Sequence, residues 1–472
     1  MVRMICNLAS WEGPSSGPRW GLLQRLGEVA GHTDPCLAVD AASPDGFRLL
    51  GNLPPHLGWP VKVKPDPALS HSNFLTASQK LLEEHKAERS RGHYRLPTKH
   101  ADALYQMLHD QSKKGFWQEY SVSAADEMLG GFASWLFFAV EEVAAYGSKK
   151  LRGCLSPEAA NGPDMVHLPN QVYMAGLDGY LATCAALADS FAKEGRNPKL
   201  QGWKEDYTDG FRQIPLSSED RRFLCALGRA PNGEVRVFVP LKLLFGPRGG
   251  PHVFCRVTDK VAAVCSVLLL APTAPHVDDL CGVEEEGGTT SAREAVLALH
   301  KALNLQLGQT KAVPDRNTPG GANQLIVLGG DVAFPQAQAE RLAGLVAKVD
   351  LPACKAAKYD RQIASTLNSG QLTSAEAGKV VGRWDFASAV ALGRSGRAFT
   401  WPLRNRARDH SPAGGLHRLP HFPQRIWEHG SAQSRRDCKT VCRSLRRCCS
   451  PRPVEPSWRH RLGPGLVQMV FH

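Results

Sequence analysis

Three aspartates stand where they could bind divalent metal ions. Asp206 lies in KEDYTDGFRQIPL, at the edge of a predicted strand, and Asp278 and Asp279 are adjacent in HVDD, between the apolar run LLLA and the short predicted strand LCGV. A hairpin can hold an adjacent aspartate pair at its turn, and a neighbouring strand can supply the third carboxylate. Mg²⁺ and Mn²⁺ prefer oxygen ligands of this kind. The pattern therefore predicts a carboxylate metal site.

Such a site has a defined chemistry. Two metal ions about 3.5–4 Å apart can clamp the attacking and leaving oxygens of an in-line displacement. The protein then contributes mainly positioning and charge neutralisation. The alternative is that Asp206 caps a turn and that the Asp278–Asp279 pair lies in a solvated loop, because paired acidic residues are common and so short a motif is weakly specific.

The segments around these aspartates resemble, in order, the motifs of the reverse transcriptase family, over residues 148–332. EDYTDGFRQIPL resembles the first palm motif and LKLLFGPRGGPHVF the second. HVDD resembles the aromatic–x–Asp–Asp box, LNLQLGQTKAV the fourth motif, which ends in a lysine, and LIVLGGDV the strand that grips the primer. The resemblance implies an RNA-directed DNA polymerase of a retrotransposon-like element, acting on a primed RNA or DNA template with dNTPs.

The resemblance also implies roles for single residues. Asp206, Asp278 and Asp279 would hold two Mg²⁺ or Mn²⁺ ions, and Lys311 would protonate the leaving pyrophosphate. The implied nucleotide-binding residues are Lys150 and Arg152 of the fingers strand KKLRG, Tyr207 through its carbonyl, Phe211, Phe245, Gly246 and Pro251.

Each nucleotide-binding role has a plain structural alternative. Phe211 would be the gate that leaves no room for a 2′-hydroxyl, or else a core residue. Phe245 and Gly246 would form the floor under the nucleotide, or else a simple glycine turn. Lys150, Arg152 and Lys311 would bind phosphates, or else lie solvated on the surface. An RNA-dependent RNA polymerase is a further alternative, which the bulky Phe211 disfavours.

Several departures from the family pattern leave activity open. His276 stands where the box usually has tyrosine, and Pro272 and Pro275 lie in the strand before it, although proline cannot donate to a strand ladder. Asp164 does not restore the acidic pair expected after the fingers strand, and Pro247 replaces an apolar residue. The alternative function is therefore a degenerate, non-catalytic relative that at most binds nucleic acid.

The resemblance also implies the fold: an α+β right-hand fingers–palm, with an antiparallel palm sheet backed by helices, and a helical thumb-like segment. The termini are expected to be disordered. Periodicity predicts helices from Ser78, after Thr98, from about Ser123 through Phe132, Leu136 and Val140, over 177–192 and over 250–264. Strands are predicted at 212–216, 223–227, 235–239, on both sides of the aspartate pair and within 324–329, with helices over 334–400.

Four regions follow from this pattern: a loosely ordered region 1–72, fingers and palm 73–332, a thumb or connection segment 333–403, and a basic tail 404–472. The tail contains 14 Lys and Arg against 4 Asp and Glu, so it carries +10 of the net charge of +12.

No apolar run approaches the length of about 20 residues that a membrane span needs, so no membrane partner is expected. The 13 scattered cysteines indicate a reducing compartment, cytoplasm or nucleus. The sequence does not decide the oligomeric state.

Overall fold

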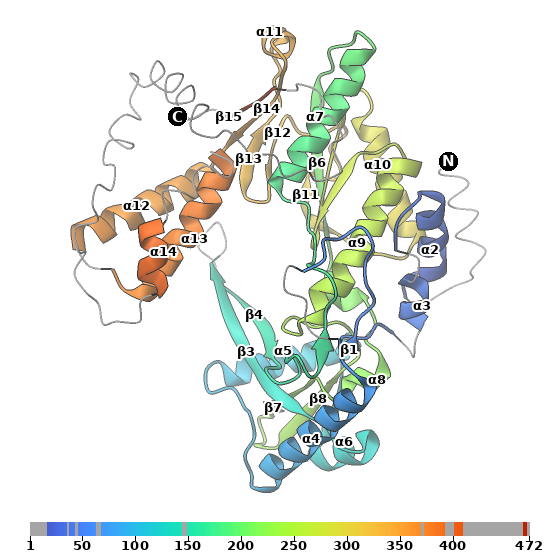
Figure 1. Ribbon diagram of the computed structural model, residues 1–472, viewed down its shortest axis with the longest axis vertical. Helices are drawn as coiled ribbons and strands as arrows, with labels where there is room; N and C mark the ends of the chain where they lie inside the picture. The colour runs from blue at the N-terminus through green and yellow to red at the C-terminus, as the bar shows by residue number, and fades with distance from the viewer. Residues whose placement is uncertain are drawn as a thin grey trace. The chain divides into compact units, whose positions relative to one another are not determined.

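The computed structural model describes residues 17–34, 37–42, 46–62, 68–143, 149–369, 372–391, 401–408 and 466–469 (Figure 1). The chain divides into two compact units. Unit 1 comprises residues 1–175, 203–282 and 288–319, and unit 2 comprises 176–202, 283–287 and 320–472. Most of the predicted basic tail lies outside the described residues. No helix among the described residues is both long and apolar enough to span a membrane.

A four-stranded sheet in the order β11-β6-β10-β9 positions the acidic residues. Its elements follow one another along the chain as β6 (Leu200–Tyr207), α9 (Gly249–Leu268), β9 (Thr273–His276), β10 (Asp279–Glu285), α10 (Thr289–Ala302) and β11 (Leu307–Val313). β9 pairs antiparallel with β10, and β11 antiparallel with β6. This βαββαβ order is the split βαβ arrangement.

The two faces of this sheet differ in character because side chains alternate along β6. Trp203, Glu205 and Tyr207 are buried on one face, where Tyr207 contacts Phe254 of α9 and His300 of α10. Lys204 and Asp206 therefore belong to the opposite face. Helices α9 and α10 pack on the first face through Phe254 and His300, whereas the second face carries the charged residues of β6 near the turn.

A second sheet of unit 1 has five strands in the order β2-β8-β7-β3-β4. These strands are β2 (Trp117–Ser121), β3 (Ser134–Val143), β4 (Lys149–Ser156), β7 (Cys225–Arg229) and β8 (Val235–Pro240). Helices α4 (His71–Ser90), α5 (Ala101–Lys113), α6 (Val122–Leu129) and α8 (Ser218–Arg221), the 3₁₀ turn η1 (Gly210–Gln213), and the short paired strands β1 (Gly51–Asn52) and β5 (Val166–His167) complete the connections. The predicted strands at 223–227 and 235–239 correspond to the hairpin β7–β8.

The segment before residue 72 differs from the loosely ordered region predicted for it. It contains α2 (Trp20–Val29) and α3 (Leu37–Ala42), and its leucines join the main core. Buried charged groups also hold it to α9. Arg256 donates to Asp34 at 2.8 and 3.0 Å and to Asp40 at 2.6 Å, and Lys260 donates to Gln24 at 2.6 Å. The described part of this segment is therefore built into unit 1.

Unit 2 contains a sheet in the order β12-β13-β14-β15 and several helices. The strands are β12 (Gln324–Val327), β13 (Gly330–Ala333), β14 (Leu345–Asp350) and β15 (Leu466–Met469). The helices are α7 (Leu177–Lys193), α11 (Gln338–Leu342), α12 (Ala353–Ser369), α13 (Ser374–Ala391) and α14 (Trp401–Arg408). The predicted all-helical stretch 334–400 thus includes the strand β14. Strand β14 pairs with β13 on one side and with β15 on the other. A local sequence pattern does not reveal such pairing.

Two other predictions of secondary structure are corrected. The helix predicted from Ser123 to Val140 ends at Leu129, because Gly130 and Gly131 adopt φ values of +62° and +97°. The chain then continues as β3, in which Trp135 and Phe137 are buried whereas Leu136 and Phe138 are exposed. The predicted strand 212–216 is instead the end of η1 followed by single bridges.

Candidate metal and nucleotide site

The hairpin β9–β10 presents the aspartate pair at its turn, as the sequence predicts. His276 pairs with Asp279, and Val277 and Asp278 form the two-residue connection. Val277 has a φ of +52°, a strained value for a β-branched residue. His276 fixes the start of the turn, because its Nδ1 lies 2.8 Å from the carbonyl oxygen of Ala175. Pro275 is tolerated because β9 is an edge strand of the sheet.

Strand β6 brings the third carboxylate to this turn. The backbone N–H of Tyr207 donates to the carbonyl oxygen of Asp278 at 3.0 Å, which joins β6 directly to the hairpin. Carboxylate oxygens of Asp206, Asp278 and Asp279 all lie within 4.8 Å of one another. Asp206 is 7% exposed, while the other two are half-buried. Residues more than 70 positions apart thus form one acidic cluster.

Two lysines neutralise part of this cluster. Lys311 on β11 donates to Asp206 Oδ1 at 2.8 Å, and Lys204 on β6 donates to Asp279 Oδ2 at 2.8 Å. The sequence predicted Lys311 but not Lys204. The signal for Lys204 was its spacing, since it lies two residues before Asp206 and therefore on the same face of the strand.

The pKa values of Asp206 and Lys311 are both raised in this cluster. Burial raises the pKa of Asp206, and the charges of Asp278 and Asp279 raise it further, against the lowering effect of Lys311. Burial lowers the pKa of Lys311, but the hydrogen bond and charge of Asp206 outweigh that effect, and the net shift is upward. Burial is the largest influence on both groups, and the three carboxylates outnumber the two lysines that contact them. Such a cluster favours a bound cation.

Beneath the cluster, the opposite face of β6 is held by a buried ion network. Glu205 is fully buried and accepts from Arg293 Nε at 2.9 Å and from Arg316 at 3.1 and 2.7 Å. Arg316 also donates to the carbonyl oxygen of Gly308 at 3.0 Å. Because Glu205 precedes Asp206, these bonds fix the backbone that carries the first carboxylate, an arrangement the sequence did not reveal.

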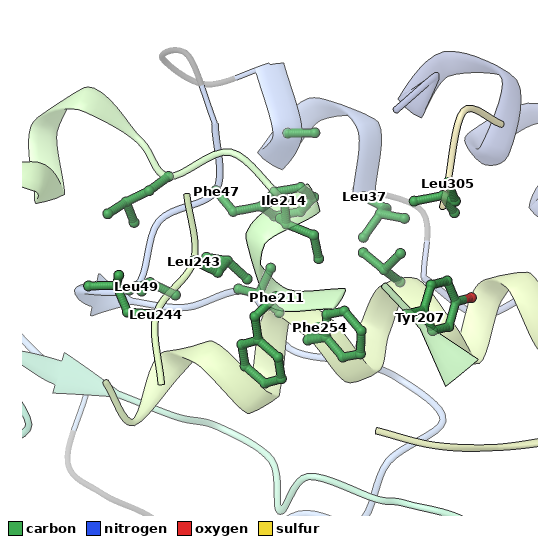
Figure 2. Close-up of a cluster of buried hydrophobic side chains, with 14 of the residues drawn as sticks. Leu37, Phe47, Leu49, Tyr207, Phe211, Ile214, Leu243, Leu244, Phe254 and Leu305 are labelled. Carbon is green, nitrogen blue, oxygen red and sulfur yellow. The ribbon is translucent and has the colours of Figure 1, made fainter. Parts of the chain in front are cut away.

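Phe211 and Tyr207 lie in the hydrophobic core beside this sheet. Figure 2 shows both among buried side chains, with Phe211 next to Phe254. The Phe211 ring stacks on Phe254, with centroids 4.6 Å apart, and is tilted against Phe245 at 4.7 Å. Phe211 is 4% exposed, whereas Phe245 is 38% exposed. The predicted gate residue therefore has a core-facing ring with one partly exposed aromatic neighbour.

The Phe245–Gly246 turn is attached to the strand that carries Arg152. The N–H of Leu155, on β4, donates to the carbonyl oxygen of Phe245 at 3.0 Å. Asn161 then donates to the carbonyl oxygen of Gly246 at 3.0 Å and accepts from the N–H of Arg248 at 2.7 Å. Asn161, in the loop after β4, thus holds both sides of Pro247 in this turn, and the sequence motifs gave no sign of it.

The remaining predicted nucleotide-binding residues are placed by their elements. Lys150 and Arg152 lie on β4, opposite Glu142 and Val140, in the five-stranded sheet rather than in the sheet of the aspartates. Pro251 is in the first turn of α9 and is exposed. At that position proline removes no helical hydrogen bond. The structure brings Asp206, Asp278, Asp279 and Lys311 together, while the roles of these and the other residues stay predictions.

The donor set of the cluster fits hard divalent cations. Three carboxylates with oxygens within 4.8 Å offer only oxygen ligands, which suits Mg²⁺ or Mn²⁺. Lys204 and Lys311 occupy carboxylate oxygens that a cation would use. These lysines would therefore compete with a metal ion for the negative charge of the cluster.

Comparison with known proteins gives limited results. No protein-family model matches the chain, and no curated protein matches its sequence. Among solved structures, the chain is similar to the foamy viral protease–reverse transcriptase in complex with double-stranded DNA, with 14% identity and a TM-score of 0.44 over 77% of this chain and 49% of that one. It is also similar to the foamy viral protease–reverse transcriptase bound to an RNA/DNA hybrid, with 13% identity and a TM-score of 0.44 over 75% of this chain. The chain spans 49% and 38% of the length of these two proteins.

Proposed function

We propose that this chain is an RNA-directed DNA polymerase that transfers nucleotides from dNTPs to a primer 3′-hydroxyl. The observation that carries the proposal is the cluster of Asp206, Asp278 and Asp279, with Lys311 at 2.8 Å from Asp206. The sequence motifs alone predict these same four residues. In this proposal the sheet β11-β6-β10-β9 is the palm, and β3–β4 belongs to the fingers.

Each residue then has a task in nucleotidyl transfer. The three aspartates would hold two Mg²⁺ or Mn²⁺ ions, which supply Lewis-acid activation of the attacking and leaving oxygens. Lys311, released from Asp206, would place its ammonium group near the leaving pyrophosphate and donate a proton to it. Phe211, supported from behind by Phe254, would limit the space available to a 2′-hydroxyl. Arg152 would bind phosphate oxygens with its planar guanidinium.

A second candidate is a non-catalytic relative that binds nucleic acid. Lys204 favours it, because this cation already engages Asp279 at 2.8 Å and competes for the ligand oxygens. His276 favours it as well, since it replaces the usual tyrosine and is engaged with the carbonyl oxygen of Ala175. The two candidates differ in whether the cluster supports primer extension.

The test is primer extension on an RNA template with dNTPs and either Mg²⁺ or Mn²⁺. We expect extension by the wild type and only background signal from Asp278→Asn, which keeps the side-chain shape but loses a charged ligand. Asp189→Asn is the matched control, because Asp189 is a half-exposed aspartate paired with Lys193 on α7. Equal inactivity of the wild type and Asp278→Asn with every metal and template would reject the polymerase and support the non-catalytic relative.

A further inference from the structure

A second group of potential metal ligands lies away from the aspartate cluster. His32 follows α2, His56 lies in the loop after β1, and Asp259 is on α9. Nε2 of His32 lies 3.2 Å from Oδ2 of Asp259, and Nε2 of His56 lies 3.3 Å from the same oxygen. The three ligand atoms are all within 4.8 Å of one another. We propose that these three residues bind a zinc ion that ties the N-terminal segment to α9.

The spacing of the ligand atoms fits tetrahedral coordination. Zinc–nitrogen and zinc–oxygen bonds of about 2.0–2.2 Å place neighbouring ligand atoms of a tetrahedron about 3.3–3.5 Å apart. The two nitrogen–oxygen distances, 3.2 and 3.3 Å, are close to that value. Two imidazoles and one carboxylate form a donor set typical of zinc. The Asp259 side chain is 34% exposed, so water can reach the fourth coordination position.

His56 supplies an independent reason to expect a ligand. The residue is 1% exposed, and its Nε2 has no hydrogen-bond partner, although Asp259 lies at contact distance. The contact with Asp259 at 3.3 Å is thus not a well-oriented hydrogen bond, and a buried polar atom without one is costly. A zinc ion at the centre of the group would satisfy this atom.

The surrounding structure holds the ligands in place. The backbone N–H of His56 donates at 2.8 Å to the side chain of Asn170, which also donates to the carbonyl oxygen of Trp59 at 3.1 Å. The His56 ring stacks on the Trp59 ring, with centroids 4.5 Å apart. The N–H of His32 donates to the carbonyl oxygen of Gly27 at 2.8 Å. Ligands fixed in this way lose little freedom when a metal binds.

Zinc binding requires one local rearrangement. Nδ1 of His32 accepts from the N–H of Asp34 at 3.2 Å, and Nδ1 of His56 accepts from the N–H of Gly58 at 3.2 Å. A neutral imidazole that binds metal through Nε2 carries its proton on Nδ1. Each neutral ring would therefore carry its proton on Nδ1 when Nε2 binds zinc, and the two backbone contacts at 3.2 Å would be exchanged for metal bonds.

The test measures zinc binding by the full chain in excess Mg²⁺, which is added to compete with zinc at the aspartate cluster. We expect zinc to raise the melting temperature of the wild type. Asp259→Asn should weaken zinc binding at least tenfold in calorimetry, while His93→Ala, at an exposed histidine, should leave it unchanged. The variant His56→Ala provides a second substitution at the site, so a folding defect in one variant does not decide the result.

X-ray absorption at the zinc edge separates this site from the cysteines of the chain. Binding at the proposed site gives nitrogen or oxygen neighbours at about 2.0–2.1 Å, whereas cysteine ligands give sulfur at about 2.3 Å. A sulfur shell, or equal zinc affinity in the wild type and Asp259→Asn, would overturn the proposal. The group would then be a set of imidazoles around one carboxylate, without a metal.

Discussion

At the scale of single residues, the aspartate cluster carries its own counter-ions. Lys204 and Lys311 each lie 2.8 Å from a carboxylate oxygen, so they balance two of three negative charges. The Lys311 side chain is 55% exposed and can leave easily, whereas that of Lys204 is 16% exposed and more confined. Lys204 is thus the cation that competes more strongly with an incoming metal ion.

Lys204→Met should therefore strengthen metal binding. A hydrogen bond between charged groups contributes about 1.5–3 kcal/mol, and removing a competitor of that strength should tighten Mn²⁺ binding about tenfold or more. Titration calorimetry with Mn²⁺ measures the change. Lys199→Met is the matched control, because Lys199 forms a similar pair with Glu286 outside the cluster. Unchanged Mn²⁺ affinity in Lys204→Met would show that Lys204 does not compete for the site.

Residue types and spacing predicted the acidic cluster correctly but not its supports. Asp206, Asp278, Asp279 and Lys311 come together as expected. Asn161 and the arginines around Glu205 were missed, because each acts through a partner more than 80 positions away. Local sequence carries no signal for such pairs. It does show alternation along a strand, which would have pointed to Lys204.

At the scale of elements, the Phe245–Gly246 turn depends on glycine for two reasons. Gly246 has a φ of +121°, and a β-carbon there would lie 1.9 Å from the carbonyl oxygen of Leu155 on β4. That carbonyl oxygen belongs to the backbone of β4, which cannot move aside without disturbing the strand. The turn and strand β4 are therefore packed tightly together.

Gly246→Ala should consequently destabilise the chain more than a substitution that only strains the backbone. Gly233→Ala is the control, because Gly233 has a φ of +86° in the β7–β8 turn and open space around it. The left-handed conformation costs a non-glycine residue about 1–2 kcal/mol, and this is the loss expected for Gly233→Ala in urea unfolding. Gly246→Ala should lose clearly more. Equal losses would mean that β4 and the turn are not coupled.

Element type was predicted best where one period dominated. Helix α9 and the hairpin β9–β10 agree with their predictions. The sequence of α9 has a long run with apolar residues at helical spacing, and that of the hairpin has two short apolar strands around a turn. Strand β3 was mistaken for helix because Phe132, Leu136 and Val140 recur every four residues. Its pairing with β4 from Leu136 to Val143, and with β7 at Ser134 and Trp135, prevailed over that spacing.

At the scale of the whole molecule, buried ion pairs join segments that are far apart in the sequence, and local sequence patterns do not reveal them. Arg256 and Asp34 are each 1% exposed and lie 222 positions apart, yet they form a bidentate pair. Removing one partner of such a pair leaves an uncompensated buried charge. The N-terminal segment therefore has a fixed position on α9, although its composition resembles that of loosely ordered chain.

Buried neutral histidines predict how the stability of unit 1 depends on pH. Burial lowers the pKa of His85, His252 and His300 to about 4 in each case. The unfolded chain binds these protons with a pKa of about 6.5, so between pH 6.5 and 4 it holds more protons than the folded chain. Stability should therefore fall as the pH falls through this window, by about 1.4 kcal/mol per pH unit for each histidine.

Equilibrium urea unfolding at pH values from 7.5 to 4.5 measures this slope. His85 is the residue to change, because its Nδ1 accepts from the N–H of Ser134 at 3.2 Å and a glutamine oxygen can replace that acceptor. His85→Gln should reduce the slope of unfolding free energy against pH by about 1.4 kcal/mol per pH unit, which corresponds to one proton. His93→Gln, at an exposed position, should leave the slope unchanged. A slope that is the same in wild type and His85→Gln would mean that His85 is not held neutral in the folded chain. The fall in stability would then have to come from the acidic groups instead.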